Sequence, residues 1–232
     1  MPAASAARAR LSSVTARSFV LILMLVCGAA ALTALAVAGQ LVPGEASFAR
    51  SVQDVPFGGA IEELADVLAS PFVEYALVAA VALAALRVRK YGLAATAVLA
   101  LAGMALNPAI KELVQRDRPT DADVVIREHA GGFGFPSGHT QSATLVYGYA
   151  AVGAARLLPR IAAVCAAGAA LLAIAAIGFD RVYNGAHWPS DVAGGALIGM
   201  SLVLAAVWMP EWLRRQLMAR TVRGTPAEGD IG

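Results

Sequence analysis

The 232 residues of the chain are 59% hydrophobic and only 15% charged, and the formal net charge is +2. This composition is too apolar for an ordinary soluble domain, so a membrane protein is expected. The Lys and Arg residues cluster between apolar runs instead of following one stripe, so the sequence gives no support for nucleic-acid binding. Both cysteines, Cys27 and Cys165, lie inside apolar runs, where they are expected to be small core or lipid-facing residues.

Six apolar runs follow one another, without an internal repeat and without the alternation typical of strands. A helix needs about 20 residues to cross the core of a bilayer. The second run is the weakest, because Glu74 lies near its start. The pattern predicts an all-α integral membrane bundle of six helices, at residues 18–42, 71–86, 91–110, 137–158, 161–179 and 191–209.

Composition also divides the chain. Residues 1–17 are predicted to be a polar tail, residues 18–212 a single domain, and residues 213–232 a tail that is basic and then disordered. Residues 43–70 are predicted to form an acidic loop with a surface helix. An alternative for the first run is a secretory signal, since a basic start and Ala36-Val37-Ala38 are compatible with cleavage there.

Lys and Arg are unevenly shared between the two sides of the predicted bundle. Twelve lie on the side of the amino terminus and six on the other. Because positive residues favour the cytoplasmic side, both termini are expected in the cytoplasm, with the protein in the plasma membrane. The loops that carry the motifs described next are separated by two spans, so they are expected to share the outer face.

The segment from Gly178 to Asp191, GFDRVYNGAHWPSD, places an arginine, a histidine and an aspartate between two apolar runs. Arg181 offers a planar, permanently charged fork for two phosphate oxygens. His187 precedes the sixth predicted helix, and Asp191 lies four residues later, on its first turn. A carboxylate there accepts a hydrogen bond from Nδ1 and leaves Nε2 basic for attack at phosphorus.

A second histidine lies in the segment from Phe135 to Thr140, FPSGHT, which opens the fourth predicted helix. The first N–H groups of a helix point outward at the positive end of its dipole and favour phosphate. Ser137 is predicted to cap the helix and to donate to the anion. Gly138 lets the backbone approach an oxyanion, and His139 is predicted to protonate the leaving oxygen.

A cationic pair, Lys111 and Arg118, belongs to the K-x6-R-P sequence that ends at Pro119. If the third helix continues to Pro119, the two cations share one face about 10 Å apart along the axis, and an intervening loop would bring them closer. Such a pair is also typical of interfacial side chains. No carboxylate cluster of the kind that Mg²⁺ needs accompanies them, so the cations are predicted to replace a metal, without a cofactor.

The three segments, in this order, resemble the signature of the type 2 phosphatidic-acid phosphatases, membrane relatives of the vanadium haloperoxidases. The resemblance covers Lys111 to Asp191 and misses one position, since Asp180 stands where the family usually has serine. It implies a metal-independent lipid phosphatase that acts through a phosphohistidine on His187. Its substrate would be a polyprenyl diphosphate, a phosphatidate or a phosphatidylglycerol phosphate. Asp180 is expected either to orient Arg181 or to weaken the oxyanion site.

The alternative is a carrier or binding protein for anionic lipid headgroups, without chemistry. Such a protein would need the cations, but it would not need two histidines with an aspartate behind one of them. Haloperoxidase activity is disfavoured, because the relatives that have it are soluble. The other charged residues between the third and fourth helices are predicted to be solvated or to lie at the rim of the site: Arg116, Asp117, Asp121, Asp123, Glu128 and His129.

Overall fold

The computed structural model describes the backbone of residues 2–223 and the side chains of residues 19–207. Within residues 2–223 it contains eight α-helices and no strand, which confirms the predicted all-α class. The predicted acidic segment holds two short helices instead of one. The helices are α1 (Pro2–Val37), α2 (Glu45–Gln53), α3 (Gly58–Leu68), α4 (Pro71–Arg87), α5 (Tyr91–Val114), α6 (Gly138–Leu157), α7 (Arg160–Tyr183) and α8 (Pro189–Arg223).

Several helix ends differ from the sequence prediction; α1, for example, ends at Val37 and not at residue 42, and α5 ends at Val114 and not at residue 110. α1 begins at Pro2, so the predicted polar tail is helical from that residue on. α7 continues to Tyr183, which places Arg181 in its last turn. α8 continues to Arg223, so the tail predicted from residue 213 is helical up to that point, and its remainder lies outside the described residues.

α5 ends before the cationic motif is complete. Pro108 lies inside the helix, and Gln115 ends it with a left-handed φ of 53°. Lys111 is therefore in the last helical turn, whereas Arg118 lies in the loop that follows. Of the two geometries expected for this pair, the loop geometry is the one observed.

Four helices are long and apolar enough to cross a membrane, namely residues Phe19–Val37 of α1, all of α5, all of α7 and residues Pro189–Val207 of α8. α3 and α4 satisfy the same criterion as a single span bent by 52°. α6 falls short of it because polar residues such as Gln141 and Thr144 lower its mean hydropathy. The protein is thus a multi-pass membrane protein, and Cys27 and Cys165 are exposed on its apolar surface, as the lipid-facing prediction requires.

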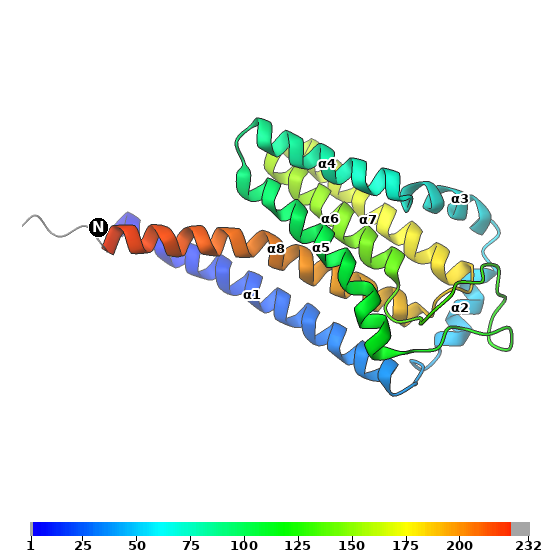
Figure 1. The fold of residues 1–232 in the computed structure, drawn as a ribbon. Coiled ribbons are helices and arrows are strands. Elements are labelled where there is room, and N and C mark those ends of the chain that lie inside the picture. Colours follow the sequence, from blue (N-terminus) through cyan, green and yellow to red (C-terminus); the bar gives the residue numbers. More distant parts are fainter. Residues whose placement is uncertain (1, 224–232) are drawn as a thin grey trace, which may run out of the picture.

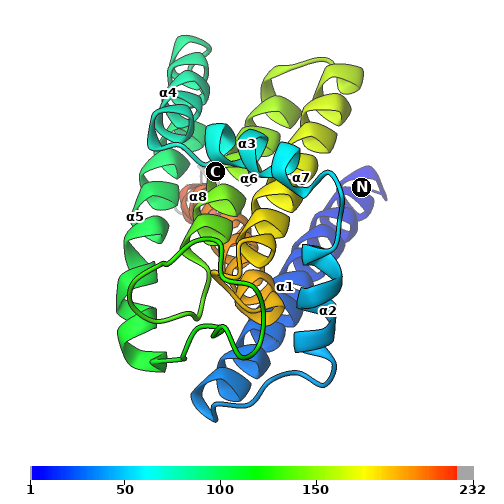
Figure 2. The same cartoon turned by 90° about the vertical axis from the view of Figure 1, so that its right-hand side faces the viewer.

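α6 lies at the centre of the bundle, where it contacts α4, α5, α7 and α8 (Figures 1 and 2). Small residues allow these contacts to be close, as is usual between membrane helices. A Cβ at Gly195 of α8 would lie 2.6 Å from the Ser137 carbonyl oxygen, and one at Gly199 would lie 2.8 Å from the Thr144 Cβ. α8 therefore packs almost backbone to backbone against the first half of α6.

The helix ends that carry the three motifs meet at one end of the bundle (Figure 1). The 23 residues between α5 and α6 form no helix or strand and lie across that end (Figure 2). Gln53 of α2 holds this loop, because its Nε2 donates to the Val125 carbonyl at 2.6 Å and its Oε1 accepts from the Val125 N–H at 3.0 Å. Arg127 adds a hydrogen bond to the Tyr183 carbonyl at 2.6 Å.

Candidate active site

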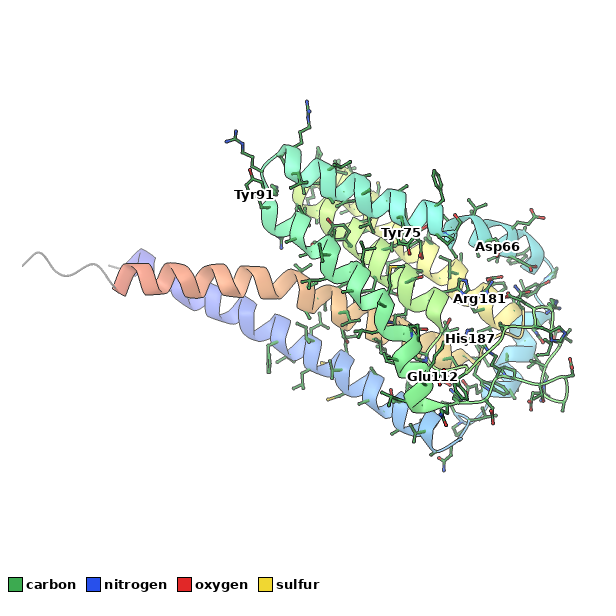
Figure 3. The ribbon with its side chains drawn as sticks, viewed as in Figure 1. Asp66, Tyr75, Tyr91, Glu112, Arg181 and His187 are labelled. Carbon is green, nitrogen blue, oxygen red and sulfur yellow. The ribbon has the colours of Figure 1, made fainter. Side chains whose placement is uncertain are left out.

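A cavity of about 440 Å³ lies at the loop end of the bundle. Figure 3 shows two of its lining residues, Arg181 and His187, at this end, next to the covering loop. Residues from all three motifs line the cavity, and they make up six of the eight predicted site residues: Lys111, Arg118, Gly138, His139, Arg181 and His187. The other two, Ser137 and Asp191, lie behind its wall.

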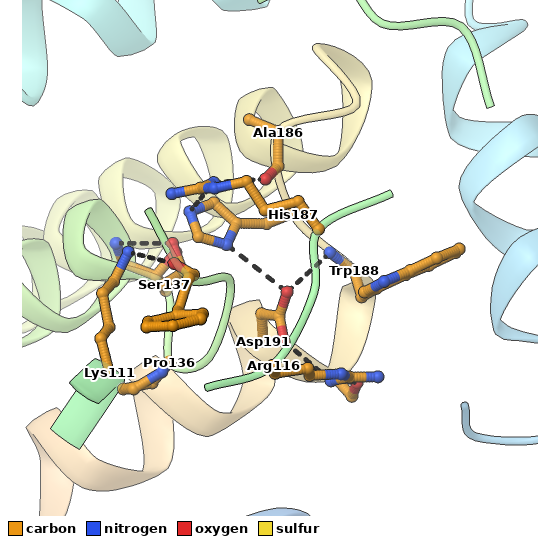
Figure 4. A network of polar contacts seen from close by, with 12 residues as sticks. Lys111, Arg116, Pro136, Ser137, Ala186, His187, Trp188 and Asp191 are labelled. Atoms are coloured by element: carbon orange, nitrogen blue, oxygen red, sulfur yellow. Dashed lines mark hydrogen bonds and ion pairs between the residues drawn. The ribbon is translucent and has the colours of Figure 1, made fainter. Parts of the chain in front are cut away.

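His187 lies in the turn between α7 and α8 and is only 4% exposed. Its Nε2 is 3.2 Å from Nη1 of Arg118, and its Nδ1 is 3.5 Å from Oδ2 of Asp191 (Figure 4). Because a guanidinium can only donate, the first contact requires an unprotonated Nε2. The ring proton is then on Nδ1 and faces Asp191. This tautomer leaves the lone pair of Nε2 for attack.

The protonation state of His187 follows from its burial. The pKa of His187 is lowered from 6.5 to about 4, mainly by burial and in smaller part by repulsion from Arg118 and Lys111. Asp191 opposes this shift, because its carboxylate lies 3.5 Å from Nδ1 and attracts a positive charge on the ring. The imidazole is therefore uncharged at neutral pH, which is the form that a nucleophile requires.

Carbonyls of the α5–α6 loop and of the turn between α7 and α8 hold Arg118 beside His187. Its Nε donates to the Gly132 carbonyl at 3.0 Å, its Nη2 to the Gly131 carbonyl at 3.0 Å, and its Nη1 to the Ala186 carbonyl at 2.5 Å. Since these partners are neutral, the positive charge of Arg118 is left for an anion.

Lys111 completes the cationic side of the cavity from the last turn of α5. Its Nζ donates to the Phe133 carbonyl at 2.9 Å, which points the ammonium group at the cavity. Among residues 19–207 there is no group of three or more His, Cys, Asp or Glu side chains arranged to hold a metal ion. The positive charge that a phosphate would meet comes from Lys111, Arg118 and Arg181.

α6 begins at the cavity wall. Ser137 caps it, because its Oγ accepts hydrogen bonds from the Thr140 N–H at 3.5 Å and the Thr140 Oγ1 at 3.1 Å. The predicted cap is therefore present, but Ser137 is fully buried and does not line the cavity, which gives no support to its predicted second role as an anion donor. Gly138 and His139 line the cavity.

Carboxylates surround Arg181. Its Nε lies 2.6 Å from Oδ2 of Asp180, its Nη1 lies 2.9 Å from Glu128, and its Nη2 lies 3.8 Å from Asp66. Asp180 is 1% exposed and also accepts from Asn184 Nδ2 at 2.7 Å. Of the two roles expected for Asp180, this geometry supports the orientation of Arg181.

Asp191 is fully buried behind His187. Its Oδ2 accepts from the Trp188 N–H at 2.9 Å, and its Oδ1 accepts from Nη1 of Arg116 at 2.7 Å. Arg116 is only 5% exposed and also contacts Glu45 and Ser190. The prediction that Arg116 is a solvated or rim residue is therefore wrong, since a charged loop residue has the same appearance in a sequence whether it is exposed or paired.

Glu74 of α4 also lines the cavity, although in the sequence it only interrupts an apolar run. It is 4% exposed, and its Oε1 accepts from the Ser142 hydroxyl at 2.8 Å. A carboxylate inside an apolar run is itself a sign of function in a membrane protein. That signal was present in the sequence.

Comparisons with known proteins found a similar sequence and a similar fold. Over 116 residues the chain is 34% identical to phosphatidylglycerophosphatase B of Bacillus subtilis (strain 168), in an alignment that covers 47% of this chain and 54% of the relative. The chain thus spans about half the length of this curated relative. The fold resembles the crystal structure of the first transmembrane PAP2 type phosphatidylglycerolphosphate phosphatase from Bacillus subtilis. The TM-score is 0.64 at 22% identity, with 88% of this chain and 96% of that chain covered.

The family model of the PAP2 superfamily matches residues 91–215, which is more than half of the chain. This stretch runs from the start of α5 into α8 and contains both histidines of the cavity and all three of its motif cations. The match therefore includes the elements that build the site, and the chain belongs to the PAP2 superfamily.

Proposed function

We propose that the protein is a membrane lipid phosphatase that hydrolyses a lipid phosphate or diphosphate at the outer membrane face. The observation that carries this proposal is the cavity itself, which is lined by three cations and two histidines, with Nε2 of His187 in contact with Arg118. Membership of the PAP2 superfamily supports phosphatase chemistry. A carrier of anionic headgroups would need the cations but not the nucleophile.

In the proposed first step, the three cations hold the phosphate oxygens and Nε2 of His187 attacks phosphorus. The bond between Nε2 and phosphorus forms as the bond from phosphorus to the leaving oxygen breaks, and His139 donates a proton to that oxygen. The product is a phosphohistidine with a positively charged ring, whose Nδ1 proton faces Asp191. The cations stabilise the charge that develops on the phosphoryl oxygens.

In the second step, water attacks the phosphohistidine. His139 now accepts the proton of the water, the bond between phosphorus and Nε2 breaks, and inorganic phosphate leaves with His187 again neutral. A lipid monophosphate substrate yields a lipid alcohol, and a lipid diphosphate yields a lipid monophosphate.

A lipid substrate fits because the cavity has an apolar side as well as a cationic one. Ala69, Pro71, Tyr75 and Met104 line it from α4, α5 and the bend before α4. The curated relative is a phosphatidylglycerophosphatase, so phosphatidylglycerophosphate is the first lipid to test. Phosphatidate and a polyprenyl diphosphate are the comparison substrates.

The test is a phosphate-release assay on the purified protein in nanodiscs, with each of these lipids and with the His187→Ala variant as the control. We expect release by the native protein in the presence of chelator, inhibition by vanadate, and no release by the variant. Lipid binding without release by the native protein would favour the carrier. Loss of release in chelator that Mg²⁺ restores would contradict the metal-independent mechanism.

A further inference from the structure

A second buried ion pair lies behind the His187–Asp191 dyad, away from the cavity. Nη1 of Arg116 donates to Oδ1 of Asp191 at 2.7 Å, and Nη2 of Arg116 lies 3.3 Å from Oε2 of Glu45. Figure 4 shows Arg116 on the side of Asp191 opposite to His187. Glu45 and Arg116 are each 5% exposed, and neither lines the cavity.

Glu45 is fixed from several sides. Its Oε1 accepts from the Ser190 N–H at 2.6 Å, and its Oε2 accepts from the Val42 N–H at 3.0 Å. The Ser190 hydroxyl in turn accepts from Nη1 of Arg116 at 2.6 Å. The pair thus connects the first residue of α2 to the first turn of α8, which is the turn that presents Asp191.

Stability alone is a weak explanation for this pair, because the desolvation of two buried charges usually offsets most of their attraction. The charge balance around His187 gives a better one. Arg116 by itself would cancel the charge of Asp191, which is the charge that a cationic His187 ring needs. Glu45 neutralises Arg116 in turn. The three buried groups therefore keep one net negative charge beside His187.

The effect of this negative charge on the His187 ring is opposed by cations on the other side of the ring. Arg118 and Lys111 both repel a positive charge on His187, and Asp191 is the group that attracts it. Arg181 and His139 share the same cavity. Formation of a phosphohistidine makes the ring cationic, so it becomes easier when the side behind the ring is negative.

We propose that Glu45 and Arg116 are positioning residues of the phosphoryl transfer. Arg116 holds Oδ1 of Asp191 so that Oδ2 faces His187, and Glu45 cancels the charge of Arg116 so that Asp191 still stabilises the phosphohistidine cation. This inference rests on the proposed phosphohistidine mechanism.

The first test is the rate at which the phosphoenzyme forms in Glu45→Gln, measured by rapid quench with a ³²P-labelled substrate. This variant keeps the size of the side chain and one hydrogen-bonding oxygen but removes the charge. We expect the rate to fall by about tenfold or more, which corresponds to ~1.4 kcal/mol less stabilisation of the cationic ring, with KM little changed because Glu45 does not line the cavity. Asp54→Asn is the matched control, since Asp54 is an exposed acid at the other end of α2.

The second test needs no substrate. The chain has three histidines, so ¹⁵N-histidine labelling with His129→Gln and His139→Gln for assignment isolates the NMR signals of His187. Arg116→Gln leaves two buried carboxylates uncompensated and is expected to raise the pKa of His187 from about 4 toward the ordinary value of about 6.5. The double variant Glu45→Gln/Arg116→Gln restores the native net charge and is expected to titrate close to the native protein.

Two results would overturn the proposal: phosphorylation of Glu45→Gln as fast as that of Asp54→Asn, or an unchanged His187 titration in Arg116→Gln. If Glu45→Gln does not fold, the double variant carries the test, because it removes both charges of the pair, and a strongly raised pKa in it would overturn the charge-balance argument. A native protein that releases no phosphate would instead contradict the proposed function, while the titration would still report on the pair.

Discussion

The two histidines of the cavity have different surroundings. His187 is buried between the guanidinium of Arg118 and the carboxylate of Asp191, which fix its tautomer and keep its Nε2 unprotonated. His139 is the second residue of α6 and is exposed on the cavity side. This difference is the reason to assign attack to His187 and proton transfer to His139.

Replacement of each histidine by alanine tests this assignment. His187→Ala is expected to abolish both turnover and the acid-labile phosphoenzyme. His139→Ala should lose about 10²–10⁴-fold with a lipid substrate but recover in part with an aryl phosphate whose phenol is acidic, because a good leaving group needs no proton. Phosphoryl label on His139 in a rapid-quench experiment would reverse the two roles.

The pH dependence of His187 reactivity is set by its lowered pKa of about 4. An imidazole with a lowered pKa stays neutral as pH falls and becomes protonated only near and below that lowered value. We follow carbethoxylation of His187 by mass spectrometry. Its second-order rate constant is therefore expected to be nearly constant from pH 7 to about pH 5 and to fall near pH 4. N-acetylhistidine, the control, loses reactivity near pH 6.5. A midpoint near 6.5 for His187 as well would show that the ring is not shielded.

Asp180 stands at the position where the resemblance to the family predicts a serine. It holds Arg181 through Nε, while Glu128 contacts the other side of the guanidinium. Since Glu128 remains, Asp180→Ser is expected to change kcat/KM by less than about tenfold, or ~1.4 kcal/mol in the barrier. Arg181→Ala is the reference for loss of the cation itself. Equal losses in the two variants would mean that Asp180 has a catalytic part of its own.

At the scale of helices, hydropathy predicts the features that depend on neighbouring residues in the sequence. The six long helices and the start of α4 at Pro71 follow from apolar runs and from proline. The end of α5 does not, because Gln115 adopts a left-handed conformation that no residue type in K-x6-R-P requires. The sequence therefore left open whether Lys111 and Arg118 share a helix face.

The ion-pair partners of buried charged side chains also could not be predicted from the sequence. Arg116 pairs with Glu45, 71 residues earlier, and with Asp191, 75 residues later. Such pairs depend on how α2 and α8 meet, which hydropathy does not report. The motif residues that line the cavity could be predicted because their chemistry and spacing are local, whereas the buried network behind them could not.

Packing between α6 and α8 positions the first turn of α6, where Gly138 and His139 line the cavity. Gly195→Ala would place a Cβ 2.6 Å from the Ser137 carbonyl oxygen, so α6 or α8 has to shift. We expect a loss of about 1–3 kcal/mol in stability, together with reduced turnover, because the shift moves Gly138 and His139. Thermal unfolding in detergent and phosphate release measure the two effects.

Gly168→Ala is the matched control for this substitution. Gly168 lies in α7, and a Cβ there would meet no atom within 4 Å. The alanine is expected to leave stability unchanged or raise it by about 0.5–1 kcal/mol. If Gly195→Ala unfolds at the same temperature as Gly168→Ala, the close approach of the two helices is not a constraint on the site.

For the whole molecule, all three motifs lie at one end of the bundle, and the loop between α4 and α5 lies at the other (Figure 1). The distribution of Lys and Arg predicts that the motif end faces outward. A background with Cys27→Ser and Cys165→Ser allows single cysteines to report this. We expect Asp121→Cys to react with an impermeant thiol reagent in intact cells and Val88→Cys to react only after permeabilisation. The opposite pattern would place the site in the cytoplasm.

The loop between α5 and α6 has a consequence for substrate binding. Arg118 donates to the loop carbonyls of Gly131 and Gly132, and Gln53 of α2 donates to the carbonyl of Val125. These hydrogen bonds order the loop without a bound substrate. The conformational entropy of 23 irregular residues is therefore lost on folding and not when a lipid arrives. The cavity is accordingly preorganised, and the affinity for a headgroup depends on desolvation and charge, with little contribution from ordering of the loop.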